Sequence, residues 1–151
     1  AFYPTQMAQD AGFKQVLWTD HREHKFLEES GTMNIMLRIG DSLVTPPLSD
    51  RILAGITRDS ILTLTRDWGM DVQERPISVD EVVAAARAGN LKEAFGMGTA
   101  AVVSTIDGIG YQDEIFDVPT PEDGFAMKIK KGLTDIRIGA AEDKYGWMVK
   151  L

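Results

Sequence analysis

Apolar residues recur at helical spacing in the middle of the chain. Over residues 56–68, Ile61, Leu64 and Trp68 fall on one face, and Gly69 follows the last of them. Side chains at this spacing form a stripe along one side of a helix, and glycine readily adopts the left-handed conformation at which many helices end. The pattern therefore predicts a helix with one buried face.

Two further helices are predicted from their start signals. The run SVDE at residues 78–81 is a capping box, which predicts a helix that ends near residue 90. The run TPED at residues 120–123 is a strong start for the last helix. The expected buried stripe of that helix consists of Phe125, Ile129, Leu133 and Ile136. Pro4 and Gly12 favour a short helix between them.

Between the helices, apolar and β-branched runs predict strands joined by turns. Residues 15–20 and 26–29 form one expected hairpin, and residues 34–39 and 43–45 form a second pair. Residues 94–104 are predicted to be a glycine-interrupted strand or loop, and residues 109–118 supply two short strands. Antiparallel pairs mixed with helices indicate a mixed α/β domain.

The composition is that of an ordinary soluble globular domain. The 151 residues are 44% hydrophobic and 26% charged, which suits one domain over residues 1–151. The net charge of −7 disfavours nonspecific nucleic-acid binding, because a phosphate backbone requires clustered Lys and Arg. The sequence has no cysteine, which excludes disulfides, thiol catalysis and thiolate metal sites.

Location and metal binding can also be judged from the sequence. No apolar run approaches the roughly 20 residues that a membrane helix requires, so we expect a cytoplasmic protein that does not span a membrane. His21 and His24 lie in a charged turn without a second ligand at metal spacing, so we interpret both as surface residues. No metal site is expected.

Three motifs carry candidate chemistry. The run EESGTMN at residues 28–34 places a carboxylate at a strand end, where it could keep a ring nitrogen protonated. In LAGITR, at residues 53–58, a glycine precedes a helix whose first N–H groups can bind an anion. In FGMGTAA, at residues 95–101, two glycines permit a close approach of the backbone to a ligand. Taken singly, Glu29 is more typical of a surface residue on a hairpin and Gly55 of an ordinary helix cap, while residues 95–101 are equally typical of a bulged strand.

Together these motifs resemble the cofactor-binding signature of branched-chain amino acid aminotransferases, which are fold-type IV enzymes that use pyridoxal phosphate (PLP). The resemblance extends over nearly the whole chain, including its ending at residues 139–151. It implies the large, carboxyl-terminal PLP-binding domain, which resembles that of D-amino acid aminotransferase. We therefore expect a mixed sheet, curled like a barrel, with helices around it.

The resemblance also implies roles for individual residues. Glu29 would contact the pyridine nitrogen of PLP, and the Ala100 amide would meet the substrate carboxylate. The implied cofactor-binding residues are Glu29, Leu53, Gly55, Ile56, Thr57 and Thr99, and the implied substrate-side residues are Thr32, Met33 and Ala100. The chain departs from the family pattern at Ser30, Ala54 and Met97, and Arg58 matches a family position without an implied ligand contact.

The resemblance further implies that the lysine that binds PLP as a Schiff base lies upstream of Ala1, because Lys14, Lys25 and Lys92 do not match its position. We therefore expect this chain to be a fragment that is inactive in isolation and lacks an amino-terminal domain. The intact enzyme would be a homodimer that transfers amino groups between Leu, Ile or Val and 2-oxoglutarate. Two alternatives stay open: another fold-type IV enzyme, a D-amino acid aminotransferase or aminodeoxychorismate lyase, or a noncatalytic fragment that binds PLP or a partner chain.

Overall fold

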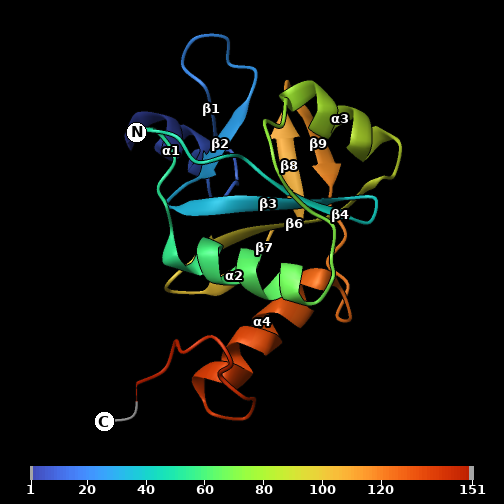
Figure 1. Ribbon diagram of the computed structural model, residues 1–151. Coiled ribbons are helices and arrows are strands. Elements are labelled where there is room, and N and C mark those ends of the chain that lie inside the picture. The colour runs from blue at the N-terminus through green and yellow to red at the C-terminus, as the bar shows by residue number, and fades with distance from the viewer. Residues whose placement is uncertain (1, 150–151) are drawn as a thin grey trace.

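The computed structural model describes residues 2–149, which form four helices and nine strands. The helices are α1 (Phe2–Asp10), α2 (Ile56–Asp67), α3 (Val79–Arg87) and α4 (Phe125–Arg137). The strands are β1 (Leu17–Thr19), β2 (Leu27–Ser30), β3 (Met33–Ile39), β4 (Ser42–Thr45), β5 (Val72–Glu74), β6 (Leu91–Gly98), β7 (Val102–Thr105), β8 (Gly108–Tyr111) and β9 (Glu114–Asp117). Figure 1 shows their arrangement.

Strand β3 is the centre of a seven-stranded sheet. One edge of β3 pairs over residues 34–39 with β6, which continues into β7. The opposite edge is shared, because β2 pairs with residues 33–34 and β4 pairs with residues 37–39. The sheet therefore forks along β3, and the polar side chains Asn34 and Thr45 lie at this fork. The Thr45 hydroxyl donates to the Ile35 carbonyl at 2.7 Å.

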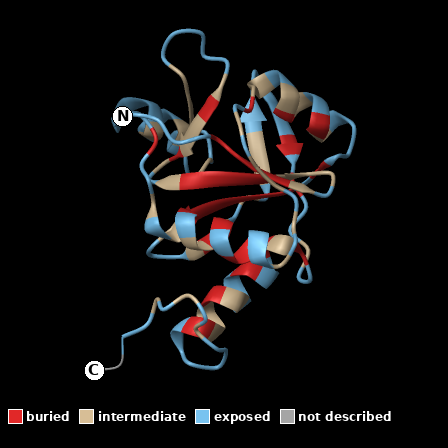
Figure 2. Cartoon of the chain, viewed as in Figure 1, coloured by how far each residue is buried: buried red, intermediate tan, exposed pale blue. Residues whose placement is uncertain are grey.

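The sheet lies between two layers, as Figures 1 and 2 show. Helices α2 and α4 cover one face, where Met36 and Phe95 pack against Ile61 and Ile129. Helix α3 and the β8–β9 hairpin lie over the other face, where the core includes Leu37. Neighbouring β3 residues thus enter different cores, since side chains alternate along a strand. This two-sided burial explains the nearly continuous apolar composition of β3.

Most predicted elements are confirmed. Helix α1 is present, and Gly12 after it has φ +91°. At the start of α3 the Ser78 hydroxyl accepts a hydrogen bond from the Glu81 N–H at 3.1 Å, as the capping box predicts. The β1–β2 hairpin, the β3–β4 pair and the β8–β9 hairpin also agree with the predicted strands.

The predicted start of the last helix was wrong by several residues. Helix α4 begins at Phe125, and its N-cap is Gly124 rather than a residue of the TPED run. The carboxylate of Glu93, on β6, accepts hydrogen bonds from the N–H groups of Phe125 and Ala126 at 2.9 and 3.0 Å. A Cβ atom on Gly124 would lie 2.4 Å from Glu93 Oε1, so this approach requires glycine. A distant strand thus supplies the cap.

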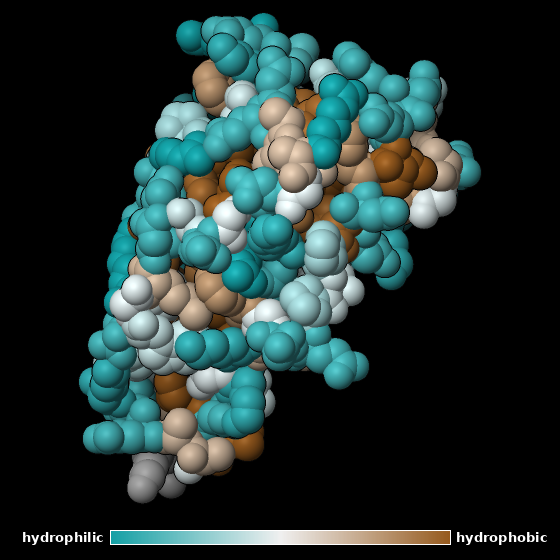
Figure 3. Space-filling view, turned by 90° about the vertical axis from the view of Figure 1, so that its right-hand side faces the viewer, coloured by the Kyte–Doolittle hydropathy of each residue, from teal (hydrophilic) through white to brown (hydrophobic). Residues whose placement is uncertain are grey.

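The sheet also differs from a barrel. Within the described residues it is open, because β1 and β5 end its order without pairing to each other. The short strand β5, which the sequence did not predict, pairs in parallel with β4. No helix in residues 2–149 is long and apolar enough to cross a membrane. On the side shown in Figure 3 the surface is mostly hydrophilic, with apolar patches between the polar groups.

Candidate functional site

Glu29 lies on β2 at the fork of the sheet, directly opposite Asn34. Its carboxylate oxygen Oε1 accepts hydrogen bonds from Asn34 Nδ2 at 3.0 Å and from the Leu53 N–H at 2.7 Å. Within residues 2–149, the other oxygen, Oε2, has no hydrogen-bond partner. Glu29 is half-buried. The carboxylate is therefore held through one oxygen and can offer the other to a ligand.

Asn34 joins Glu29 to the loop that precedes α2. Its amide also donates to the Leu53 carbonyl at 2.9 Å, so Leu53 is bound through both its N–H and its C=O. Glu28 adds an ion pair to Arg51 of the same loop at 3.1 Å. Consecutive acids on β2 thus hold this loop beside the sheet.

Gly55 is the N-cap of α2 and has extended backbone, with φ −66°. A Cβ atom there would lie 2.3 Å from Asn34 Oδ1, so the position requires glycine for a close approach and not for unusual dihedral angles. Among residues 2–149, no side chain accepts a hydrogen bond from the N–H groups of Ile56 or Thr57. The N–H groups of Ile56 and Thr57 belong to the first turn and have no intrahelical acceptor, so they are available to an anion.

Arg58 fixes the same helix from its buried side. Its guanidinium is 4% exposed and donates from Nη2 to the Pro46 carbonyl at 3.0 Å and to Glu74 at 2.8 Å. Hydrogen bonds from Arg66 and Arg58 hold the pKa of the Glu74 carboxyl below its ordinary value. Arg58 thus joins α2 to the segment before it and to β5.

Ile56, Thr57 and Thr99 line one cavity of about 430 Å³. The cavity thus brings together the start of α2 and the β6–β7 turn, which are separated by some forty residues in the sequence. Arg137 at the end of α4 also lines it, as do Trp147 and Met148 of the carboxyl-terminal segment. Its size is in the range typical of small-molecule sites.

The carboxyl-terminal segment reaches this cavity because it is fastened to the far end of α2. The Tyr145 hydroxyl donates to Asp67 Oδ2 at 2.9 Å, and Lys144 forms an ion pair with the same carboxylate. These bonds lower the pKa of Asp67. The Tyr145 ring stacks on Trp147 with a centroid separation of 4.3 Å, and Trp147 lines the cavity.

Two of the three substrate-side candidates lie on turns, and the third, Met33, is the first residue of β3. Thr32 is exposed at the β2–β3 turn and Ala100 is exposed at the β6–β7 turn. Met33 is half-buried and lies over β6, where a Cβ atom on Gly96 would be 2.8 Å from Met33 Cε. The glycines of β6 thus make room for Met33, which forms an apolar wall between the turns.

The three departures from the family pattern have clear positions. Met97 is 1% exposed and lies in the core that the sheet forms with α2 and α4. Where the family usually has a hydroxyl residue, this chain therefore has an apolar side chain that packs in the core. Ser30 is buried on β2 next to Glu29, and Ala54 is exposed in the loop before α2.

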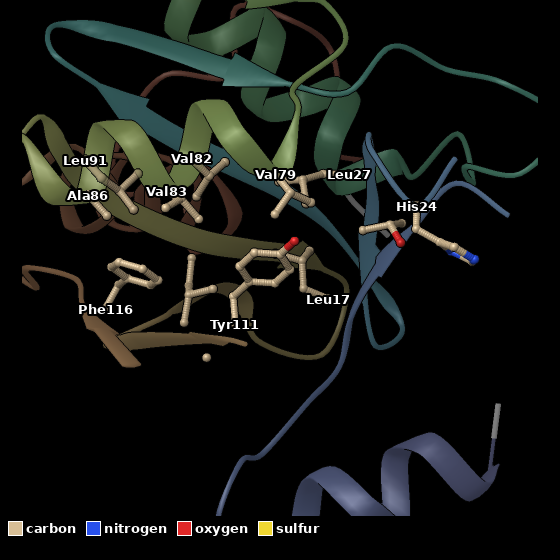
Figure 4. A pocket seen from close by; sticks show the side chains of 13 residues that line it. Leu17, His24, Leu27, Val79, Val82, Val83, Ala86, Leu91, Tyr111 and Phe116 are labelled. Carbon is tan, nitrogen blue, oxygen red and sulfur yellow. The ribbon is translucent and has the colours of Figure 1, made fainter. Parts of the chain in front are cut away.

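A second cavity, of about 340 Å³, contains none of the predicted site residues. Val82 and Val83 of α3 line one side, and Tyr111 and Phe116 of the β8–β9 hairpin face them (Figure 4). The imidazole of His24 points away from the other labelled side chains. The lining is chiefly apolar. Within residues 2–149, no cluster of three or more His, Asp and Glu residues is arranged to hold a metal ion.

The sequence reasoning missed the role of Asn34. The signal was visible, because Asn34 is a lone amide in the apolar run of β3, where a buried polar side chain requires partners. Trp147 was part of the matched chain ending, but no local pattern placed it beside Thr57 and Thr99. Its position follows from the attachment of the carboxyl-terminal segment to α2.

Comparisons with known proteins show the family and the fold of this chain. The sequence profile of the amino-transferase class IV family matches residues 2–109. Branched-chain-amino-acid aminotransferase 2 of Bacillus subtilis (strain 168) is 45% identical over 147 residues, which cover 97% of this chain and 40% of that protein. The probable branched-chain-amino-acid aminotransferase of Staphylococcus epidermidis (strain RP62A) is 43% identical, with 95% and 40% covered.

A solved structure has the same fold. The branched-chain aminotransferase of Thermoproteus uzoniensis, determined with norvaline, superposes with a TM-score of 0.78 and 26% identity. The match covers 96% of this chain and 44% of that one. The chain thus spans about 40% of the length of the curated relatives it matches.

Proposed function

This chain belongs to the class IV aminotransferase family, and from that premise we propose that it is the cofactor-binding part of a branched-chain amino acid aminotransferase. The observation that carries the proposal is the carboxylate of Glu29, which is fixed by Asn34 and Leu53 through Oε1 and leaves Oε2 free at the fork of the sheet. The cofactor is PLP, which is general in this family and which supplies an electron sink for the substrate carbanion.

The residues present fit PLP. The free oxygen of Glu29 would accept a hydrogen bond from the protonated pyridine nitrogen and so keep that nitrogen charged. The uncapped N–H groups of Ile56 and Thr57 would hold the phosphate, because the start of a helix favours an anion. Thr99 lines the same cavity and would add its hydroxyl. Gly55 and the doubly bound Leu53 fix the backbone between the two groups.

The two turns would bind the substrate. The Ala100 amide would donate to the substrate carboxylate, and Thr32 would lie on the side of the amino acid. Met33 offers an apolar and pliable wall, which suits the branched side chains of Leu, Ile and Val. The reaction we propose is amino transfer between these amino acids and 2-oxoglutarate.

Other parts of the assembly complete the site. We propose that the Schiff-base lysine comes from the remaining part of the enzyme, since this chain spans about 40% of the length of its relatives. It would act as the proton carrier of the reaction. We further propose that the enzyme is a homodimer, as the family resemblance implies, and that it is cytoplasmic.

The test is Glu29→Gln in the intact protein. Glutamine keeps a carbonyl oxygen for the N–H groups of Asn34 and Leu53, so the fold and the bound cofactor should persist. The neutral amide no longer favours ring protonation, so we expect transamination of leucine to fall about a hundredfold, or about 2.7 kcal/mol in the barrier. The matched control is Glu114→Gln, on an exposed ion pair far from the site. Equal turnover for the two variants would contradict the assignment of Glu29 as the partner of the pyridine nitrogen.

A further inference from the structure

The tip of the β6–β7 hairpin ends in a tight turn centred on Val102. The last strand pair is Gly98 with Val102, and residues 99–101 form the tip. The Val103 N–H donates to the Ala101 carbonyl at 2.7 Å, which closes a three-residue γ-turn around Val102. Its φ is +62°, which belongs to the rarer and strained form of this turn.

A valine at this φ is unusual. Among residues 2–149, the other non-glycine residues with positive φ are the polar turn residues His24, Gln112 and Asp113, so Val102 is the only β-branched one. Branched side chains clash with the backbone in this region, whereas glycine adopts it freely. The strain must therefore be offset by contacts of the valine side chain.

Those contacts lie toward α4. Val102 is half-buried and packs against the core that contains Val103, Leu133 and Ile136. It also lines the 430 Å³ cavity together with Thr57 and Thr99. The side chain thus anchors the base of the tip to the core at the point where the tip faces the start of α2.

We propose that Val102 is a positioning residue, whose anchored γ-turn holds the 99–101 tip in the conformation that binds cofactor phosphate and substrate carboxylate. This inference rests on the proposed function. Amides that are already fixed do not lose conformational entropy when a ligand binds, so a rigid tip lowers the cost of binding. The side chain of Val102 would act through Thr99 and Ala100 and not through the reacting atoms.

The first experiment compares amide hydrogen exchange in the wild-type protein and in its Val102→Gly variant, both as the intact enzyme. Glycine accepts the positive φ without strain but removes the anchor. We expect exchange of the Val103 N–H, which donates to the Ala101 carbonyl across the turn, to accelerate about tenfold while the thermal midpoint stays within about two degrees of wild type. Unchanged exchange at Val103 would overturn the proposal, and this readout does not depend on enzyme activity.

The second experiment measures transamination kinetics of the same proteins with leucine and 2-oxoglutarate. Val102→Gly should raise KM about tenfold and change kcat less than threefold, because the tip contributes to binding rather than to chemistry. Val102→Asn, which tolerates positive φ and also lacks the apolar anchor, should behave alike if the glycine variant fails to fold. Gln112→Gly is the matched control, because it relieves a positive φ of +49° at the β8–β9 hairpin and should leave KM unchanged.

The outcomes separate the two proposals. A wild-type protein without transaminase activity would contradict the proposed function, while the exchange data would still test whether Val102 holds the turn in place. An active wild type with unchanged KM in both Val102 variants would overturn the positioning role. A joint fall of kcat and thermal midpoint at unchanged KM would also overturn it, because that pattern indicates a purely structural residue.

Discussion

Glu93 should be among the most important polar residues for stability, although it lies outside the candidate site. Its side chain is 2% exposed and it accepts three hydrogen bonds: from the N–H groups of Phe125 and Ala126, and from Arg38 Nη1 at 3.0 Å. The Arg38 guanidinium also lies 3.7 Å from the centre of the Phe125 ring. One carboxylate thus joins β3, β6 and the start of α4.

The substitution Glu93→Gln removes the charge and turns one acceptor oxygen into an amide that can only donate. At least one charge-assisted hydrogen bond is lost, which costs about 1.5–3 kcal/mol. The attraction between the carboxylate and the helix start adds about 0.3–1 kcal/mol. Arg38 is 21% exposed and its guanidinium lies 3.5 Å from the Asp41 carboxylate, so it keeps an ion-pair partner in the variant. The loss of folding stability is therefore smaller than for breaking a fully buried ion pair. We expect about 3 kcal/mol of destabilisation.

The assay is urea unfolding of the 151-residue chain, followed by far-UV circular dichroism. Amide exchange at Phe125 and Ala126 gives a local readout, since these N–H groups donate to different oxygens of Glu93 and at least one of them loses its acceptor. The control is again Glu114→Gln, whose ion pair to Arg87 has side chains 50% and 63% exposed and should contribute less than about 1 kcal/mol. If the two variants unfold within about 1 kcal/mol of each other, the role assigned to Glu93 is refuted.

Two further predictions concern the site and the β1–β2 loop. Gly55→Ala should weaken PLP binding by the intact protein about tenfold, because the new Cβ displaces Asn34 and thereby Glu29. The control Gly108→Ala meets only ordinary contacts near 3.6 Å and should leave PLP affinity unchanged. Equal cofactor affinity of the two variants in a fluorescence titration would contradict this prediction. Hydrogen bonds from backbone N–H groups, above all that of Phe26, hold the pKa of the Asp20 carboxyl well below its usual range. Because the folded pKa is lowered, the stabilisation is complete above about pH 4 and is lost only as the pH falls through the folded pKa. The amide shift of Phe26 should therefore stay constant from pH 6 through pH 4, and an inflection near pH 4 would count against this.

Much of the fold could be read from local patterns. The stripe of Ile61 and Leu64, the capping box at Ser78 and the apolar run of β3 depend on neighbours in sequence, and all were confirmed. The start of α4 could not be read, because its capping carboxylate comes from Glu93 on another strand. Strand β5 was missed because three residues with little periodicity become a strand only through pairing with β4.

In the candidate site, too, some features were predicted from the sequence and others depend on segments that are far apart in the chain. Family resemblance indicated Glu29, Thr57 and Thr99, and the fold brings Thr57 and Thr99 to one cavity, with Glu29 linked to it through the loop before α2. The role of Asn34 required the fork, because its amide bonds connect segments that only the sheet brings together.

The sequence by itself determined most of the element types, the apolar faces and the family motifs, because these follow from the spacing and identity of nearby residues. Only the tertiary structure decided which oxygen of Glu29 is free, which carboxylate caps α4, and how Val102 adopts a strained turn. These features depend on hydrogen bonds and packing between segments far apart in the chain, where topology selects one partner among many chemically equivalent groups.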